Sequence, residues 1–326
     1  MTSAPRRKRA HRRLLGITAL GLAFALVLAT VGVGAVATNS FGAANLFDRA
    51  VAKVDRFLAG PVPDRAAPDT VVDSAPPVAI EDLDPDDIPI VAPVVGAGGP
   101  AITPIPVPSA NPTPTPKAPR VPLTFDIVAD HKAVFAHELK VTWCASAGVQ
   151  MVLAILNHGN TSHDFQREIQ GRVREWESVK DSRNGDWGPS AMALALDDYG
   201  AKGYEVRAYQ TRQGALRGAA KAIMKTNSPV ILLAWRGAHT WIMTGFKADA
   251  DPTIFSNAKI KGTYILDPWY PDISSIWGPS DPPGTFQDND EMIRNFLPWK
   301  RPEGRYPDRD GLYITVVPTI PVSPPG

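Results

Sequence analysis

Proline is unevenly distributed along this chain: 17 of its 33 prolines lie between Pro61 and Pro122. A proline ring fixes φ and leaves no amide donor, so such a segment cannot build a helix or a ladder. Repeats such as the one from Pro104 to Pro108 favour extended polyproline II instead. The length alone would suggest two domains. The prolines instead predict a disordered linker followed by one globular domain over residues 123–326.

The N-terminus combines basic residues with a long apolar run. Residues 1–13 contain six Lys or Arg residues, and the run from Leu14 to Val36 has no charged side chain. About 20 apolar residues span a bilayer, whereas the apolar region of a signal peptide is about 7–15 residues long. Length therefore predicts a transmembrane helix over residues 14–38, with residues 1–13 as a cytoplasmic tail. The rest of the chain would then be extracytoplasmic, held at the cell membrane by a single pass.

Two features of the same region leave an alternative open. Ala35-Val36-Ala37 has the small-x-small form of a cleavage site, and Arg12-Arg13 resembles part of a twin-arginine signal. Cleavage near Ala37 would make the protein secreted. In either case residues 39–122 are expected to be a stalk and linker, which opens with an amphipathic helix over residues 43–58.

Charge and cysteine content exclude several classes of function. The net charge is +1, so no global field favours nucleic acid, and we expect no nucleic-acid partner. Cys144 is the single cysteine, which rules out an intramolecular disulfide. His163 beside Asp164 is too little for a metal site. We predict no cofactor, no metal and a monomer.

The spacing of apolar residues changes along the domain: it is helical in the first part and alternates, as in strands, in the later part. Helices are expected over residues 143–156, with Thr142 as N-cap and Gly159 as the left-handed terminator, and over 163–176, 189–199 and 213–226. Strands are expected at 204–209, 229–235, 240–246, 263–266 and 312–317. Helices followed by an antiparallel sheet predict an α+β domain.

Three residues in this pattern can carry nucleophilic chemistry. Cys144 lies at the start of its helix, where the helix field would stabilise a thiolate. His239 begins one predicted strand and Asp267 ends another, so a hairpin would bring them together. A thiol, an imidazole and an orienting carboxylate in this order can act as nucleophile, base and acid. Taken singly, each has a structural explanation: a buried thiol, a core histidine and an Asp-Pro turn.

The sequences around these residues resemble the papain-like cysteine peptidases of the C39-like group. The matching segments are Trp143-Cys144-Ala-Ser-Ala-Gly-Val-Gln150, Gly237-Ala-His239-Thr-Trp and Leu266-Asp267-Pro268-Trp269. The resemblance covers about the last 190 residues. It implies a papain-like fold with a nucleophile helix, a peptide or protein substrate, and Cys144, His239 and Asp267 as the catalytic residues.

One position departs from the family. Such peptidases place a glutamine six residues before the cysteine, in the oxyanion region, and here that residue is Glu138. A protonated Glu138, the Cys144 amide or Lys140 could supply the oxyanion donor instead. The sequence thus predicts a membrane-anchored extracytoplasmic cysteine peptidase that works through a thioester. A transamidase using the same triad, or a non-catalytic papain-like domain that binds at the envelope, remains an alternative.

Overall fold

The computed structural model describes residues 43–73, 119–182, 187–274, 276–300 and 304–324. The chain divides into two compact units, Met1–Pro61 with Lys140–Thr142, and Val62–Leu139 with Trp143–Gly326. The first unit contains α2 (Ala43–Leu58), which has the predicted bounds. No helix in the described part of the chain is long and apolar enough to cross a bilayer. The expected transmembrane helix, residues 14–38, lies outside the described residues.

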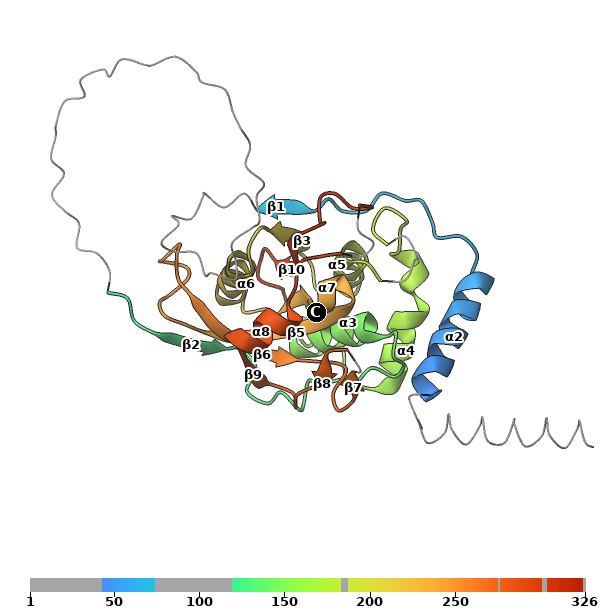
Figure 1. Ribbon diagram of the computed structural model, residues 1–326, viewed down its shortest axis with the longest axis horizontal. Helices are drawn as coiled ribbons and strands as arrows, with labels where there is room; N and C mark the ends of the chain where they lie inside the picture. The colour runs from blue at the N-terminus through green and yellow to red at the C-terminus, as the bar shows by residue number, and fades with distance from the viewer. Residues whose placement is uncertain (1–42, 74–118, 183–186, 275, 301–303, 325–326) are drawn as a thin grey trace, which may run out of the picture. The chain divides into compact units, whose positions relative to one another are not determined.

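The second unit is built on a mixed sheet (Figure 1). Its strand order is β1-β3-β10-β4-β5-β6-β9, and β2 pairs with β5 beside this path. All of these pairs are antiparallel except β1 with β3. The strands are β1 (Val71–Asp73), β2 (Leu123–Asp126), β3 (Tyr204–Tyr209), β4 (Val230–Leu233), β5 (His239–Ala248), β6 (Ile260–Leu266), β9 (Thr285–Asp288) and β10 (Tyr313–Pro318). A separate two-stranded sheet joins β7 (Ile273–Ser274) to β8 (Gly278–Pro279).

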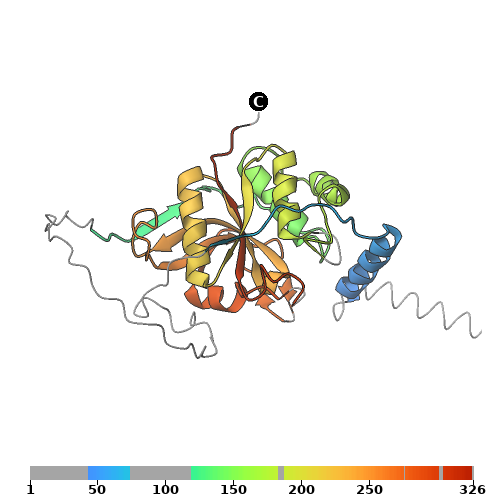
Figure 2. The ribbon, with the colours of Figure 1, turned by 90° about the horizontal axis from the view of Figure 1, so that it is seen from above.

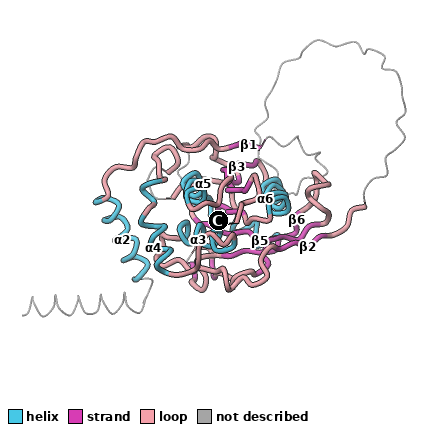
Figure 3. The backbone as a smooth tube through the Cα atoms, turned by 180° about the vertical axis from the view of Figure 1, so that it is seen from behind, coloured by secondary structure: helices cyan, strands magenta, loops and turns pink. Residues whose placement is uncertain are grey.

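Helices cover both faces of this sheet. Helices α3 (Cys144–Ile155) and α5 (Pro189–Asp198) lie on one face, and α6 (Arg212–Thr226) lies on the other (Figures 2 and 3). The main hydrophobic core fills the space between α3, α5 and the sheet, with Val149, Leu196 and Ile242 fully buried. The remaining helices are α4 (His163–Gly171), a 3₁₀ turn at Val173–Glu175, the short turn α7 (Ala234–Gly237) and α8 (Asn289–Asn295). The α+β prediction is confirmed.

The residues at the ends of helices α5 and α3 test the helix boundaries that were predicted from the sequence. Helix α5 begins at Pro189, as expected, because a proline at the first position loses no intrahelical hydrogen bond. Helix α3 begins at Cys144 with Trp143 as its N-cap and no side-chain cap, so Thr142 was wrongly expected to cap it. Its left-handed terminator is Asn157, with φ of 62°, rather than Gly159. Asparagine tolerates this conformation, so the cap moved two residues toward the helix.

Part of the predicted linker belongs to the domain. Strand β1 pairs in parallel with β3, so the expectation that no ladder forms between residues 60 and 122 is wrong here. The reason is local: Thr70 to Asp73 contains no proline, and its amides are free to pair. The preceding residues are also held, because Val179 donates its amide to the Pro63 carbonyl at 2.9 Å. The rest of the predicted linker, residues 74–118, lies outside the described residues.

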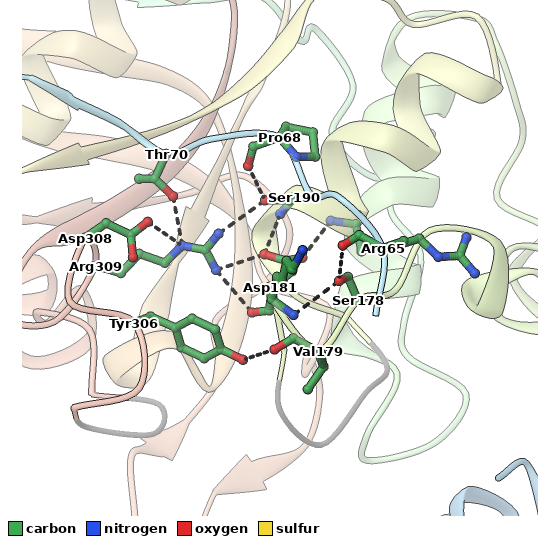
Figure 4. Close-up of polar contacts among 12 residues, drawn as sticks. Arg65, Pro68, Thr70, Ser178, Val179, Asp181, Ser190, Tyr306, Asp308 and Arg309 are labelled. Carbon is green, nitrogen blue, oxygen red and sulfur yellow. Dashed lines mark hydrogen bonds and ion pairs between the residues drawn. The ribbon is translucent and has the colours of Figure 1, made fainter. Parts of the chain in front are cut away.

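Residues 62–73 form a strap along the domain, and a cluster around a buried ion pair holds this strap in place (Figure 4). The Arg309 guanidinium lies 2.8 Å from the Asp181 carboxylate, and both side chains are buried. The same guanidinium donates to the Thr70 hydroxyl at 2.9 Å. The Ser190 hydroxyl donates to the Pro68 carbonyl at 3.1 Å. A buried pair satisfied by extra hydrogen bonds is costly to break, so this cluster makes residues 62–73 a structural part of the domain.

Candidate active site

The β5–β6 hairpin brings His239 and Asp267 together. Ile242 pairs with Leu266, so the start of β5 lies beside the end of β6 at one end of the hairpin. The His239 Nε2 atom lies 2.7 Å from Asp267 Oδ1. Both side chains are buried, and the pair is therefore shielded from water. The sequence-based expectation that strand pairing would join these two residues is confirmed by this contact.

Cys144 approaches this pair from helix α3. Its sulfur, a ring nitrogen of His239 and a carboxyl oxygen of Glu138 all lie within 4.8 Å of one another. The close approach of α3 to β5 depends on Gly148, one turn after Cys144. A Cβ atom at that position would lie 2.5 Å from Cγ2 of Thr240. Only a residue without a side chain allows the helix to carry the sulfur this near to the strand.

The hydrogen bond that Asp267 accepts from His239 decides which ring nitrogen faces the sulfur. Because Asp267 engages Nε2, the nitrogen left for the thiol is Nδ1. The carboxylate is itself fixed, since Oδ1 also accepts the Trp269 amide at 2.9 Å. An imidazole held in this way can take a proton on Nδ1 while Asp267 stabilises the resulting cation.

Tryptophans that the sequence reasoning did not assign to the site surround the imidazole. The Trp235 ring stacks on His239 with centroids 4.0 Å apart and an interplanar angle of 17°. Trp269 meets the same ring edge-on, at 89°. The Trp235 indole donates to Asn295 Oδ1 at 3.0 Å, which fixes its plane. This packing fixes the orientation of the imidazole and shields it from water.

The backbone that presents Trp235 is strained. Trp235 and Arg236 have φ values of 52° and 62°, and Gly237 follows at 83°. A non-glycine residue in the left-handed region costs about 1–2 kcal/mol. The turn is held at its far end, because Lys300 donates its amide to the Arg236 carbonyl at 3.2 Å. The predicted strand over residues 229–235 is wrong at its end, because β4 stops at Leu233 and nothing in the residue types of Trp235 and Arg236 indicates positive φ.

Glu138, which stands where a glutamine was expected, has a buried side chain next to Asp267. Its amide donates to the Pro268 carbonyl at 2.9 Å, which places the residue beside the Asp267 loop. The side chain is buried, with 3% exposure. Neither carboxyl oxygen has a hydrogen-bond partner among the described residues. Burial raises the pKa of the Glu138 carboxyl, and the negative charges of Asp267 and Asp272 raise it further.

The electrostatics of the thiol overturn one expectation. The start of a helix was expected to lower the pKa of Cys144. Instead, burial raises the pKa of its thiol, and the nearby Glu138 raises it further, while hydrogen bonds from Thr240 lower it in part. Cys144 keeps some exposure, yet enough protein surrounds the sulfur for desolvation to outweigh the field of the helix. The raised pKa leaves Cys144 as a neutral thiol at neutral pH.

The β5–β6 loop and Trp187 lie away from this centre. The loop between β5 and β6 is at the opposite end of the hairpin from His239, so residues 249–259 do not line the site. Trp187 packs against Trp176 and donates to Gln170, on the helical side of the domain. Of the aromatic residues near the C-terminus, Phe296 and Trp299 are buried.

Comparisons with known proteins add little to this geometry. No protein-family model matches the chain. No curated protein matches it significantly. One solved structure to which it is similar is a double glycine motif protease from an AMS/PCAT transporter in complex with the leader peptide, at 18% identity and a TM-score of 0.29. The match covers 57% of this chain and 91% of that one. At this TM-score we base the function on the geometry of the site instead.

Proposed function

We propose that this chain is a cysteine peptidase that hydrolyses peptide bonds through a thioester. The observation that carries the proposal is the arrangement of three side chains: Asp267 bonds one nitrogen of His239 at 2.7 Å, and the Cys144 sulfur lies within 4.8 Å of a ring nitrogen. A nucleophile, a base and a group that orients the base are thus placed in series. Trp235 and Trp269 exclude water from the imidazole.

The reaction assigns one role to each group. The Cys144 sulfur attacks the carbonyl carbon of the peptide bond while its proton passes to His239. The C–N bond then breaks, and the imidazolium returns that proton to the departing amine. Water, deprotonated by His239, attacks the thioester, and the carboxylic acid leaves as the thiol is restored. Asp267 holds the tautomer and stabilises the imidazolium throughout.

The raised pKa of Cys144 decides how the first step starts. A preformed thiolate–imidazolium pair is not the resting state of such a site, because the buried thiol keeps its proton. His239 then acts as a true general base, and the proton moves as the carbon–sulfur bond forms. The attraction between the Trp235 ring and His239 is strongest at that moment, when the imidazole becomes a cation.

Two groups serve the negative oxygen that develops on the substrate. The Cys144 amide is in the first turn of α3, where amides have no intrahelical acceptor. Glu138 occupies the second position as a neutral acid, whose hydroxyl can donate because neither oxygen is engaged among the described residues. We expect Glu138→Ala to lower the rate by about 10²–10³-fold, as loss of one oxyanion donor does, and Glu138→Gln to restore much of it.

The proposal extends to where the enzyme works. The charge-free run from Leu14 to Val36 and the basic residues before it support an anchor over residues 14–38, with the domain outside the membrane. The substrate would be a peptide or protein of the envelope or the exterior. Because β1 is part of the sheet, residues 62–73 would belong to the catalytic unit itself and not to a spacer.

A comparison of cleavage products tests the proposal. Purified full-length protein is incubated with a proteome-derived peptide library, and new termini are identified by mass spectrometry. We expect cleavage that disappears in Cys144→Ala and falls by about 10⁴-fold in Asp267→Asn, where the wrong tautomer is favoured. Crosslinked products without new carboxyl termini would indicate transamidation. Cleavage equal in Cys144→Ala and wild type, or absent from both, refutes the peptidase.

A further inference from the structure

The carboxyl group of Glu138 has a position that its oxyanion role does not require. Both oxygens are buried without a hydrogen-bond partner among the described residues, and one lies within 4.8 Å of both the Cys144 sulfur and a His239 nitrogen. An amide at this position would donate a hydrogen bond as well as a carboxylic acid does. What the carboxyl adds is an oxygen that can become anionic and bind a cation.

The three side chains form a ligand set of known chemistry. A thiolate sulfur, an imidazole nitrogen and a carboxylate oxygen are the atoms that bind Zn²⁺, at about 2.3, 2.0 and 2.0–2.2 Å respectively. Around a tetrahedral ion, ligand atoms at these lengths lie roughly 3–4 Å apart. The observed separations, at most 4.8 Å, need only small side-chain rotations to reach that spacing. Two anionic ligands would also balance the charge of one divalent cation.

We propose that Glu138, Cys144 and His239 form a binding site for Zn²⁺ at the mouth of the catalytic centre. Geometry outside the ligand set supports the assignment. His239 bonds Asp267 through its other nitrogen, which is the carboxylate–histidine arrangement that orients metal ligands. Asp267 is fixed in turn by the Trp269 amide. Cys144 is the least buried of the three residues, so the ion and a fourth ligand, water, would enter from its side.

Metal binding and peptide hydrolysis exclude each other in this arrangement. A sulfur that is bonded to Zn²⁺ cannot attack a carbonyl, and a ring nitrogen that is bonded to it cannot accept a proton. The ion would therefore be a reversible inhibitor that also shields an exported thiol from alkylation and oxidation. This regulatory consequence rests on the proposed function, whereas the metal site itself depends only on the three side chains.

Cobalt substitution tests the site without any substrate. The full-length protein, reduced and freed of metal by a chelating resin, is titrated with Co²⁺ and followed by absorption. We expect one equivalent to produce a sulfur-to-cobalt charge-transfer band with tetrahedral ligand-field bands, both removed by Zn²⁺. Cys144→Ser should abolish the charge-transfer band. Asp267→Asn should weaken binding by about 10–100-fold, as loss of an outer partner does.

The role of Glu138 is the decisive part of the test. Glu138→Gln preserves shape and removes the anionic oxygen, so its affinity should fall by more than that of Asp267→Asn. The matched control is His163→Ala, an exposed histidine at the start of α4, which should bind Co²⁺ as the wild type does. Absence of the band in wild type, or equal affinity in Glu138→Gln and wild type, overturns the proposal. Circular dichroism of each variant checks that it is folded.

Alkylation separates this proposal from the peptidase proposal. Zn²⁺ should slow the reaction of iodoacetamide with Cys144 at least tenfold in wild type, and a chelator should restore it. The protection should be lost in Glu138→Gln. If the band and the protection are present but no Cys144-dependent cleavage is found, the peptidase proposal fails and the metal site stands. If cleavage is present without the band or the protection, the metal site fails alone.

Discussion

The burial of Glu138 predicts how the stability of the metal-free protein changes with pH. Its carboxyl group has 3% exposure and no hydrogen-bond partner among the described residues. Burial, and then the charges of Asp267 and Asp272, raise its pKa in the folded state. In the unfolded chain the same group has an ordinary pKa of about 4.3. The perturbation is Glu138→Gln, which keeps the size of the side chain and removes its titration.

The sign of the effect follows from proton binding. Between the ordinary pKa and the raised one, the folded protein holds a proton on Glu138 that the unfolded chain has released. The contribution of this group to stability is therefore complete below about pH 4.3 and is lost as pH rises toward the folded pKa. The free energy of unfolding falls by at most about 1.4 kcal/mol per pH unit in that interval. From pH 5 to pH 7 the limit is about 2.7 kcal/mol.

Urea denaturation at a series of pH values measures this effect. The free energy of unfolding is determined for wild type and Glu138→Gln with a chelator present, between about pH 4.5 and pH 8. Titrating groups that do not interact with Glu138 are common to both proteins, so their contributions cancel in the difference between them. We expect wild type to lose stability relative to Glu138→Gln as pH rises, with a slope that approaches the one-proton limit.

The control variant is Asp164→Asn, whose carboxylate is exposed at the start of α4. Its difference from wild type should stay within about 0.5 kcal/mol at every pH, as for ordinary surface substitutions. A difference between wild type and Glu138→Gln that does not change with pH would refute the reasoning. It would show that the Glu138 carboxyl titrates in the folded protein as it does in the unfolded chain.

Three further predictions concern the supports of the site. Gly148→Ala places a Cβ atom 2.5 Å from the Thr240 side chain, so it should destabilise the fold by about 1–3 kcal/mol in urea denaturation and lower the rate of hydrolysis. Unchanged stability would mean that α3 can shift freely. Arg309→Ala leaves the buried Asp181 carboxylate unpaired and should cost about 3–5 kcal/mol. A loss below 1 kcal/mol, on the order of an exposed pair, would contradict the burial of the strap contact. The rate of Cys144 alkylation in the metal-free protein should still rise above about pH 8.5, because burial raises the thiol pKa, and a plateau below that pH would refute a neutral resting thiol.

Several features of the site could be predicted from short-range patterns. Alternation of apolar residues identified β5 and β6 as strands, and the positions of His239 and Asp267 at their ends required only antiparallel pairing to meet. The apolar stripe after Cys144 identified α3. These predictions succeeded because helical and strand periods are set by neighbouring residues.

Other features depend on partners far away in the chain. Strand β1 pairs with β3, more than 130 residues later, and Arg309 reaches back to Thr70. The turn at Trp235 is left-handed although its letters favour no such conformation. Long-range contacts hold each of these features against its local preference, and no local pattern shows which contacts those are.

The sequence by itself predicted that Cys144, His239 and Asp267 would lie together, since residue types and strand ends suffice to bring them to one place. Only the tertiary structure decided whether the thiol of Cys144 is protonated. The start of a helix was expected to favour a thiolate, but burial and Glu138 raise the pKa of Cys144 instead. The sequence showed only that Glu138 stands where a glutamine was expected. The structure shows that its carboxyl group is buried close to the Cys144 sulfur and the His239 imidazole. Desolvation depends on all the atoms that surround a group, and those are assembled only when the chain folds.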